Sequence, residues 1–197
     1  MAKRPLRPGA LLSPLPTALV TCGDREEYNV LTIAWTGIAC TNPPMTYISV
    51  RPQRHSYGLL RKTGEFVLHP APAALARVAD YCGTFTGAKV NKFEKCGLTI
   101  EPGLEVAAPR IAECPIAIEC RVKQVIPLGS HDLFLAEIVS VSAEDALFDA
   151  AGKLHMERAA LCAYVHGEYR ELGRAVGRFG FSAVRKKKGK HRGQAKD

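Results

Sequence analysis

Four hydrogen-bond donors stand within six residues, directly after a segment with the composition of a β-strand: Arg51, Arg54, His55 and Ser56. Guanidinium groups bind phosphate through paired, charge-assisted hydrogen bonds, and a hydroxyl adds a further donor. The residues that follow have the pattern of a short helix, and the N–H groups of a first helical turn attract anions. The pattern therefore favours a phosphate site with Arg51 and Ser56 as its first members. A solvated strand end, the ordinary use of a charge cluster, is the alternative.

An earlier segment, residues 29–37, is also rich in β-branched and aromatic residues and predicts another strand. Alternation divides its side chains between two faces, with Val30, Thr32, Ala34 and Thr36 on one and Leu31, Ile33 and Trp35 on the other. The first face is small and partly hydroxylated, so a flat polar ring can lie close to it and hydrogen-bond to the backbone. Such a face beside a phosphate site is what a mononucleotide cofactor needs, and an ordinary half-buried strand is the alternative. In a regular strand Trp35 belongs to the core, unless a bulge at Gly37 turns it.

Short strands and a few helices must hold these residues in place. Alternation and turn signals predict strands at 17–22, 29–37, 47–51, 65–68, 116–125, 133–141 and 159–165. The second and third of these are separated by an Asn-Pro-Pro turn and should be neighbours. Helices are expected from Ser56 to a stop at Gly64, at 72–82 with Gly83 as the stop, and at 90–96 before another glycine. Because no βαβ rhythm is present, the order favours a closed antiparallel barrel of mainly β class.

In the order and spacing of its motifs the chain resembles the flavin reductase-like, FMN-binding split-barrel family, which includes flavoredoxins. The motifs are Asn29-x-x-Thr32-x-x-Trp35, Pro43-Pro44, Ser49-Val-Arg-Pro, Arg54-His-Ser56, Gly64-Glu-Phe-Val and Asn91-Lys-Phe93. None of them is specific alone. Their order over residues 14–167 carries the resemblance, and Asn91 departs from it, since the family more often has Asp there. The resemblance implies an antiparallel, Greek-key-like split β-barrel with a few short helices. It also implies that FMN binds along the strand predicted at 29–37 and at the donor cluster. The residues that would bind it are Asn29, Thr32, Ile33, Ala34, Trp35, Thr36, Arg51, Arg54, His55 and Ser56.

Two further segments gain a role from the resemblance. In the family, a loop like residues 84–93 lies near the flavin, often from the other subunit, so Lys89 and Lys92 are candidates to meet the phosphate. His131, in a predicted hairpin turn, would border the flavin ring or the nicotinamide. The alternatives are a plain connecting loop and an ordinary turn. No Gly-x-Ser-x-Gly elbow accompanies the pair His131-Asp132, and no carboxylates form a defensible pair, so we assign no catalytic side chain.

The activity that the resemblance implies is that of an FMN-dependent oxidoreductase. A hydride passes from NAD(P)H to the flavin, and the reduced flavin passes electrons to an acceptor. No Gly-x-Gly-x-x-Gly follows a strand, so a separate dinucleotide domain is not expected. A homodimer with FMN at its interface is implied as well. The alternatives are a flavoredoxin-type electron carrier, reduced by another protein, and a nucleic-acid-binding protein that acts through a basic tail.

Charge and composition divide the chain. Of the net charge of +8, residues 185–197 contribute +6 through seven Lys/Arg and one Asp. We expect a flexible arm at 1–12, one split-barrel domain at 13–167, an extension at 168–184, and a disordered basic tail at 185–197 that can contact polyanions nonspecifically. With no apolar run near the ~20 residues of a membrane span and no signal-peptide segment, a cytoplasmic location without membrane contact is expected. Seven cysteines without a Cys-x-x-Cys pair indicate buried thiols rather than disulfides or a metal site.

Overall fold

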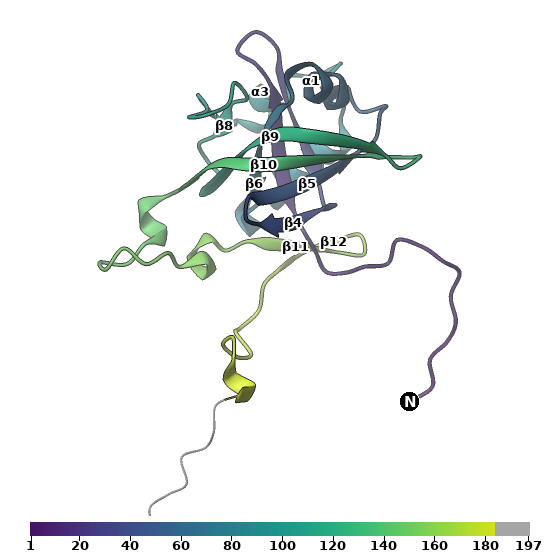
Figure 1. Ribbon diagram of the computed structural model, residues 1–197, viewed down its shortest axis with the longest axis vertical. Helices are drawn as coiled ribbons and strands as arrows, with labels where there is room; N and C mark the ends of the chain where they lie inside the picture. The colour runs from purple at the N-terminus through teal and green to yellow at the C-terminus, as the bar shows by residue number, and fades with distance from the viewer. Residues whose placement is uncertain (184–197) are drawn as a thin grey trace, which may run out of the picture.

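The computed structural model describes residues 1–183, and antiparallel strands dominate it (Figure 1). A seven-stranded sheet has the order β3-β2-β6-β9-β10-β5-β4 and consists of β2 (Ala18–Gly23), β3 (Tyr28–Ile33), β4 (Thr36–Thr41), β5 (Pro44–Val50), β6 (Glu65–Pro70), β9 (Ile116–Pro127) and β10 (Asp132–Ala143). A second sheet has the order β1-β11-β12, from β1 (Leu15–Pro16), β11 (Cys162–Val165) and β12 (Glu168–Glu171), and β7 (Ile100–Glu101) pairs with β8 (Arg110–Ile111). The helices are α1 (His55–Thr63), α2 (Ala76–Thr84) and α3 (Lys92–Cys96), with 3-10 turns at Ala73–Leu75, Asp145–Leu147, Met156–Ala159 and Phe181–Ala183. The expected tail at 185–197 lies outside the described residues.

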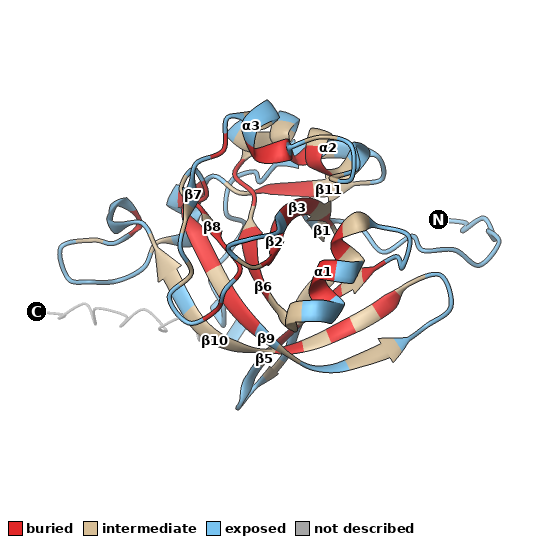
Figure 2. Cartoon of the chain, turned by 90° about the horizontal axis from the view of Figure 1, so that it is seen from above, coloured by how far each residue is buried: buried red, intermediate tan, exposed pale blue. Residues whose placement is uncertain are grey.

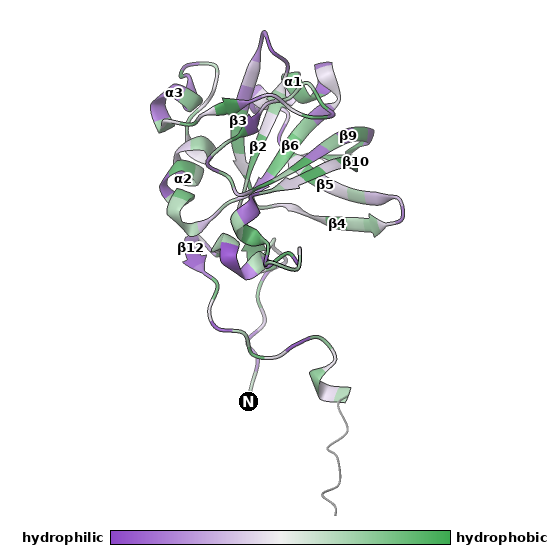
Figure 3. Cartoon of the chain, turned by 90° about the vertical axis from the view of Figure 1, so that its left-hand side faces the viewer, coloured by the Kyte–Doolittle hydropathy of each residue, from purple (hydrophilic) through white to green (hydrophobic). Residues whose placement is uncertain are grey.

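The seven-stranded sheet curls around one hydrophobic core. Side chains from six of its strands meet there, among them Val20, Leu31, Ile48, Phe66, Cys120 and Phe134. Leu59 and Leu60 of α1 belong to the same cluster, so this helix closes the barrel. Buried stretches mark the strands around the core in Figure 2, and Figure 3 shows hydrophobic stretches on these strands. Each fully buried Phe, Ile or Leu contributes roughly 1.5–3 kcal/mol to folding, so this core holds the site's framework rigid. The expected mainly β, antiparallel class is confirmed.

The segment expected as one strand at 29–37 is two strands. β3 ends at Ile33, Ala34 and Trp35 lie outside any strand, and β4 begins at Thr36. The two halves then pair with different partners: β3 pairs with β2, and β4 pairs with β5. The expectation of one strand was therefore wrong. The expected pairing with the strand at 47–51 was right for β4 and wrong for β3. The break follows from closure of the barrel, since the chain crosses from one edge of the sheet to the other.

Helix boundaries follow local signals in two places and tertiary packing in a third. Gly64 ends α1 in a left-handed conformation with φ of 66°, and Gly97 ends α3 in the same way, as expected. Asn91 caps α3 by accepting a hydrogen bond from the backbone N–H of Glu94, a role that Asn and Asp fill equally well. Gly83, by contrast, does not stop α2, which continues to Thr84.

The reason lies in the packing of α2 against β3. A Cβ atom on Gly83 would meet the Cβ of Thr32 at 3.3 Å, so the glycine allows the helix to approach the strand closely. Val30 of β3 shares a second hydrophobic cluster with Ala79 and Cys82 of α2 and Phe93 of α3. The two helices therefore cover the outer face of β3.

The terminal segments meet on one side of the barrel. β1 pairs with β11, and β11 forms a hairpin with β12, so the paired structure continues past the domain boundary expected at 167 to Glu171. Of the strand expected at 159–165, only Cys162–Val165 forms. Residues 1–12 form no helix or strand, and the first part of this segment runs away from the barrel in Figure 1. Among the described residues, no helix is long and apolar enough to cross a bilayer.

Candidate functional site

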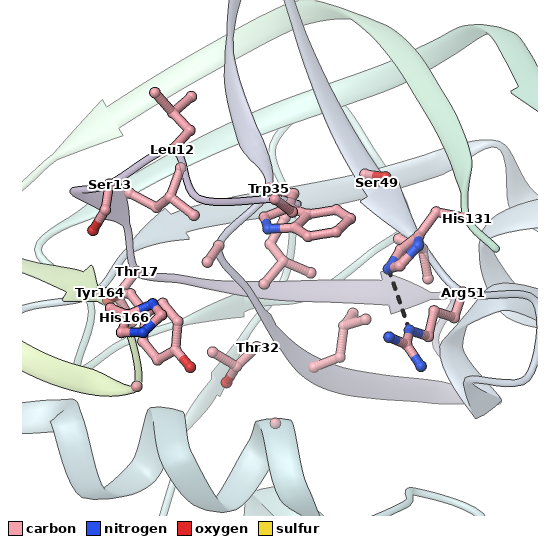
Figure 4. A pocket seen from close by; sticks show the side chains of 18 of the residues that line it. Leu12, Ser13, Thr17, Thr32, Trp35, Ser49, Arg51, His131, Tyr164 and His166 are labelled. Atoms are coloured by element: carbon pink, nitrogen blue, oxygen red, sulfur yellow. Dashed lines mark hydrogen bonds between the residues drawn. The ribbon is translucent and has the colours of Figure 1, made fainter. Parts of the chain in front are cut away.

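A cavity of about 790 Å³ opens where β3 ends (Figure 4). Its walls come from segments far apart in sequence. They are the link after β3, the end of β5, the β9–β10 turn, the end of α2, the β11–β12 hairpin and residues 10–13. Of the residues expected to bind a cofactor, the cavity gathers Thr32, Ile33, Ala34, Trp35, Arg51, Arg54 and His131.

Trp35 lies at the centre of this cavity in Figure 4. The expectation that a regular strand would bury it in the core was wrong, because the chain leaves the sheet at Ala34 and the side chain is 41% exposed. The irregularity in β4 falls between Ile38 and Cys40, so a bulge at Gly37 is not what turns it. The indole instead lies against the ring of His131, with centroids 4.6 Å apart and planes tilted by 35°.

His131 is held in one protonation state by its neighbours. Arg51 donates a hydrogen bond from Nε to Nε2 of His131 at 3.3 Å, and Ser130 Oγ lies 2.9 Å from Nδ1. Because an arginine Nε can only donate, Nε2 must accept, which places the proton on Nδ1. Partial burial, reinforced by the charges of Arg51 and Arg54, lowers the pKa of His131 and favours the same neutral form. The ring can thus fix the guanidinium of Arg51 at the cavity wall.

The strand end beneath His131 is anchored as well. Asp132 is buried, and its carboxylate accepts a hydrogen bond from the hydroxyl of Tyr57 at 2.6 Å. This hydrogen bond to Asp132 raises the pKa of Tyr57, so the phenol remains a donor at neutral pH. The contact ties the turn that carries His131 to helix α1.

A smaller cavity of about 100 Å³ lies at the N-terminus of α1. It gathers the other expected donors, Asn29, His55, Ser56 and Lys92, and shares Leu31, Thr32, Arg54 and Gly83 with the larger cavity. Arg51 and Ser56, expected to lead one phosphate site, therefore line different cavities. Arg54 lines both, and its Nη1 donates to the carbonyl of Gly83 at 3.0 Å.

Lys92 and Asn29 form the buried floor of the smaller cavity. The ammonium of Lys92 donates to the carbonyls of Val30 at 2.9 Å and Cys82 at 2.7 Å, and Asn29 Nδ2 donates to Ser56 Oγ at 2.7 Å. Burial lowers the pKa of Lys92, and within residues 1–183 the charged groups that influence it include no carboxylate. Lys92 thus joins α3 to β3 and α2, and it also supplies a buried positive charge that an anion would stabilise.

Two expectations fail in the single chain, and a third depends on a second subunit. The small face of β3 is not open, because Thr32 Oγ1 donates to the carbonyl of Ala79 and α2 covers the strand. Thr36 donates to the carbonyl of Tyr47 at 2.6 Å and lines neither cavity. Lys89 is exposed and also lines neither, so its expected role across a subunit interface stays a prediction. In the described part of the chain, no cluster of His, Cys, Asp or Glu is placed to hold a metal.

The family model for the flavin reductase like domain matches residues 11–173. The chain belongs to this family. An uncharacterised protein of Archaeoglobus fulgidus is 36% identical over 138 residues, which is 70% of this chain and 77% of the relative. The flavoredoxin of Desulfovibrio vulgaris (Miyazaki F) is similar in structure, with a TM-score of 0.84, 31% identity and coverage of 92% of this chain and 99% of its own. An FMN-binding protein from Thermus thermophilus, solved with bound 1-cyclohex-2-enone, gives a TM-score of 0.71 at 25% identity and covers 87% and 93%.

Membership in the flavin reductase-like family confirms the resemblance read from the motifs, and the split-barrel fold agrees with it. The FMN expectation agrees with the family and with these neighbours. The sequence motifs did not identify part of the larger cavity of this chain, namely Thr17, Tyr164, His166 and residues 10–13. No periodic signal marks these residues, since only the pairing of β1 with β11 brings them to the cavity.

Proposed function

We propose that this flavin reductase-like protein binds FMN across the two adjoining cavities and works as an NAD(P)H-dependent flavin oxidoreductase. The observation that carries the proposal is that a cationic cavity at α1 adjoins an aromatic cavity at Trp35, with four lining residues in common. A mononucleotide flavin has a phosphate at one end and a planar ring at the other. The smaller, cationic cavity suits the phosphate and the larger, aromatic cavity suits the ring. Residues of β3 line both cavities.

The donors at the cationic end fit a phosphate. None of the salt bridges formed within residues 1–183 involves Arg54 or Lys92, so both charges are available to a ligand. Arg54 is also the N-cap of α1 and gives that helix no side-chain cap. A phosphate would therefore gain hydrogen bonds from Arg54, from the Ser56 hydroxyl and from the first turn of the helix.

The aromatic end fits a planar ring. Its volume of about 790 Å³ lies within the usual range of small-molecule sites, roughly 300–1,000 Å³. Trp35 and His131 offer ring faces for stacking, and Ala34, which lies outside any strand, offers backbone groups. When bound, FMN supplies the capacity to accept a hydride and release electrons singly or in pairs.

The side chains of the chain then contribute geometry rather than acid–base catalysis. Trp35 and His131 fix the plane in which a ring can lie, and Arg51 is held at the wall for a polar group of the ligand or donor. Positioning two reactants in a productive geometry can by itself supply much of a rate enhancement. A nicotinamide would enter from the open side of the cavity.

We further propose a homodimer with the cavity at its interface. Trp35 of the larger cavity is 41% exposed and Phe85 of the smaller cavity 47%, and Ile38 of β4, which lines neither, is 67% exposed. A twofold dimer would cover such a surface with the same surface of the partner. Lys89, which lines neither cavity of its own chain, would then be free to reach the cavity of the other.

A flavoredoxin-type electron carrier is the second candidate, supported by 31% identity to a flavoredoxin over nearly the whole chain. Such a protein would exchange electrons with a protein partner rather than with NAD(P)H. The proposed nucleic-acid contact of the basic tail concerns residues outside the described part of the chain.

Stopped-flow reduction distinguishes the two candidates. FMN-loaded protein is mixed without oxygen with excess NADH or NADPH, and flavin bleaching is followed at its visible absorption band. The flavin reductase proposal expects complete bleaching at catalytic rates, about 1–10³ s⁻¹, with at least one donor. Bleaching by dithionite but not by either nicotinamide would reject it in favour of the electron carrier.

A further inference from the structure

Thr17 lines the larger cavity, and its buried hydroxyl has no hydrogen-bond partner in the described part of the chain. Thr17 is 2% exposed and lines the cavity, and its backbone carbonyl accepts from the N–H of Ala71 at 2.9 Å. Among the buried side-chain nitrogen and oxygen atoms of residues 1–183, Thr17 Oγ1 is the one with no partner. Burying an unsatisfied hydroxyl destabilises the folded protein, and a valine would fill the same space without that cost. Packing therefore does not explain a threonine here.

Two further polar side chains stand beside Thr17. The pairing of β1 with β11 sets Leu15 opposite Tyr164, which brings the β11–β12 hairpin next to Thr17. Figure 4 shows Thr17, Tyr164 and His166 together at one end of the cavity, with Arg51 and His131 at the other and Trp35 between them. The larger cavity thus has two polar ends, and Arg51 lies at the end away from Thr17.

His166 is held at this end by an unusual backbone conformation. It has a φ of 48°, followed by Gly167 at 97°, in a two-residue turn between the paired residues Val165 and Glu168. Turns of this kind are most often Asn-Gly, and histidine is another non-glycine residue that is enriched at positive φ. A histidine at this position therefore suits the turn and also brings an imidazole to the cavity wall.

We propose that Thr17 and His166 form a binding subsite for an amide-type group, a carbonyl oxygen next to an N–H. A hydroxyl donates and accepts, and a neutral imidazole has one donor and one acceptor, so the pair can satisfy both halves of such a group. The inference rests on the proposed function, which brings two groups of this chemistry to the cavity: the imide edge of the flavin ring and the carboxamide of the nicotinamide. Thr17 and His166 would recognise one of them.

The test removes the Thr17 hydroxyl and keeps the shape of its side chain. Thr17→Val is compared with Thr17→Ser, which keeps the hydroxyl, and with the unaltered protein. FMN affinity is measured by titration of the apoprotein, following the fluorescence of Trp35, the single tryptophan of the chain. Oxidised NAD⁺ and NADP⁺, which cannot reduce the flavin, are then titrated into the FMN-loaded proteins.

Loss of one neutral hydrogen bond predicts that Thr17→Val weakens one of these ligands about 2- to 10-fold, with Thr17→Ser changed less than about 2-fold. Weaker FMN binding assigns the subsite to the flavin imide, and weaker nicotinamide binding alone assigns it to the carboxamide. The apoprotein of Thr17→Val should melt at the same or a higher temperature, because an unsatisfied hydroxyl has been removed. Unchanged affinity for all ligands overturns the subsite while leaving the proposed function intact.

His166→Gly and His166→Asn provide a second test, since both residues tolerate positive φ and preserve the turn. The Gly variant should weaken the ligand that Thr17→Val weakens, and the Asn variant, which keeps a donor and an acceptor, should weaken it less. Equal affinity in His166→Gly and the unaltered protein would remove His166 from the subsite. Failure of the unaltered protein to bind FMN or either dinucleotide would overturn the proposed function and this inference together.

Discussion

Arg51 donates a hydrogen bond from Nε to Nε2 of His131 at 3.3 Å, although the two residues are 80 positions apart in the chain. The contact joins the end of β5 to the β9–β10 turn, and the His131 ring also lies against the indole of Trp35. It requires a neutral His131, because a protonated ring would present a second positive charge to Arg51. A histidine used in this way positions a cation and does not transfer protons.

His131→Ala should therefore slow flavin reduction only modestly. With FMN saturating, we expect a loss of about tenfold or less, equivalent to roughly 1.4 kcal/mol in the activation free energy. The measurement is single-turnover reduction by the better nicotinamide donor. FMN saturation is essential, so that weaker cofactor binding is not mistaken for slower chemistry. A loss near a thousandfold would mean that His131 takes part in the chemistry.

Arg54 and Arg51 should differ in their effect on the phosphate. Arg54 lines both cavities and Arg51 only the larger one. Hydrogen bonds to charged groups contribute roughly 1.5–3 kcal/mol, so Arg54→Ala should weaken FMN binding about 10- to 150-fold. Riboflavin, which lacks the phosphate, should lose much less, and Arg51→Ala should affect FMN and riboflavin alike. If Arg51→Ala showed the phosphate-selective loss instead, the assignment of the phosphate to the α1 end would be incorrect.

Lys92 should contribute to stability as well as to binding. Lys92→Met would leave the buried carbonyls of Val30 and Cys82 without their donor, while relieving a buried charge. We expect the free energy of unfolding to fall by about 2 kcal/mol, measured by urea denaturation of the apoprotein. Lys89→Met is the matched control, because Lys89 is exposed and should change stability by no more than about 0.5 kcal/mol. Equal effects of the two substitutions would argue against a structural role for Lys92.

His69 should make the barrel sensitive to acid. Burial lowers its pKa from 6.5 to about 4, and the ring is neutral in the fold, accepting from the N–H of Ile111 at 3.1 Å while Nδ1 faces the carbonyl of Leu19 at 3.3 Å. The unfolded chain binds this proton more readily, so stability is fully present above about pH 6.5 and falls as the pH drops toward 4. The shift corresponds to roughly 3 kcal/mol.

His69→Gln tests this directly, because glutamine can supply a donor and an acceptor but does not titrate. Its stability at pH 7 should be lower than that of the unaltered protein, and its loss of stability between pH 7 and 4 should be smaller. Parallel pH profiles for the two proteins would show that other groups control acid unfolding.

Local signals predicted the elements whose ends depend on their own residues. Gly64 and Gly97 terminate helices where the sequence places them, and the β9–β10 hairpin turns where expected. The break at Ala34 and Trp35 was not predictable in this way, since residues 30–36 are mostly good strand formers and only barrel closure divides them. Gly83 looked like a stop, yet its lack of a side chain serves packing against Thr32.

The site shows the same division. Donors that are close in sequence, Arg54, His55 and Ser56, do meet at one cavity. Arg51, only a few residues earlier, was separated from Ser56 because one stands before the helix and the other within its first turn. Thr17 and His166 belong to the cavity through the pairing of β1 with β11, a contact between chain ends that no local pattern records.

Titration of the apoprotein with FMN and with riboflavin, read through the fluorescence of Trp35, tests the central claim most directly. Trp35 is the single tryptophan and lies in the larger cavity, so its emission reports a ring bound there. We expect saturable quenching at one flavin per chain, with FMN bound at least about tenfold more tightly than riboflavin because only FMN reaches the cationic end. Quenching with equal affinities would contradict the phosphate site, and no quenching by either flavin would contradict the binding of FMN across the two cavities.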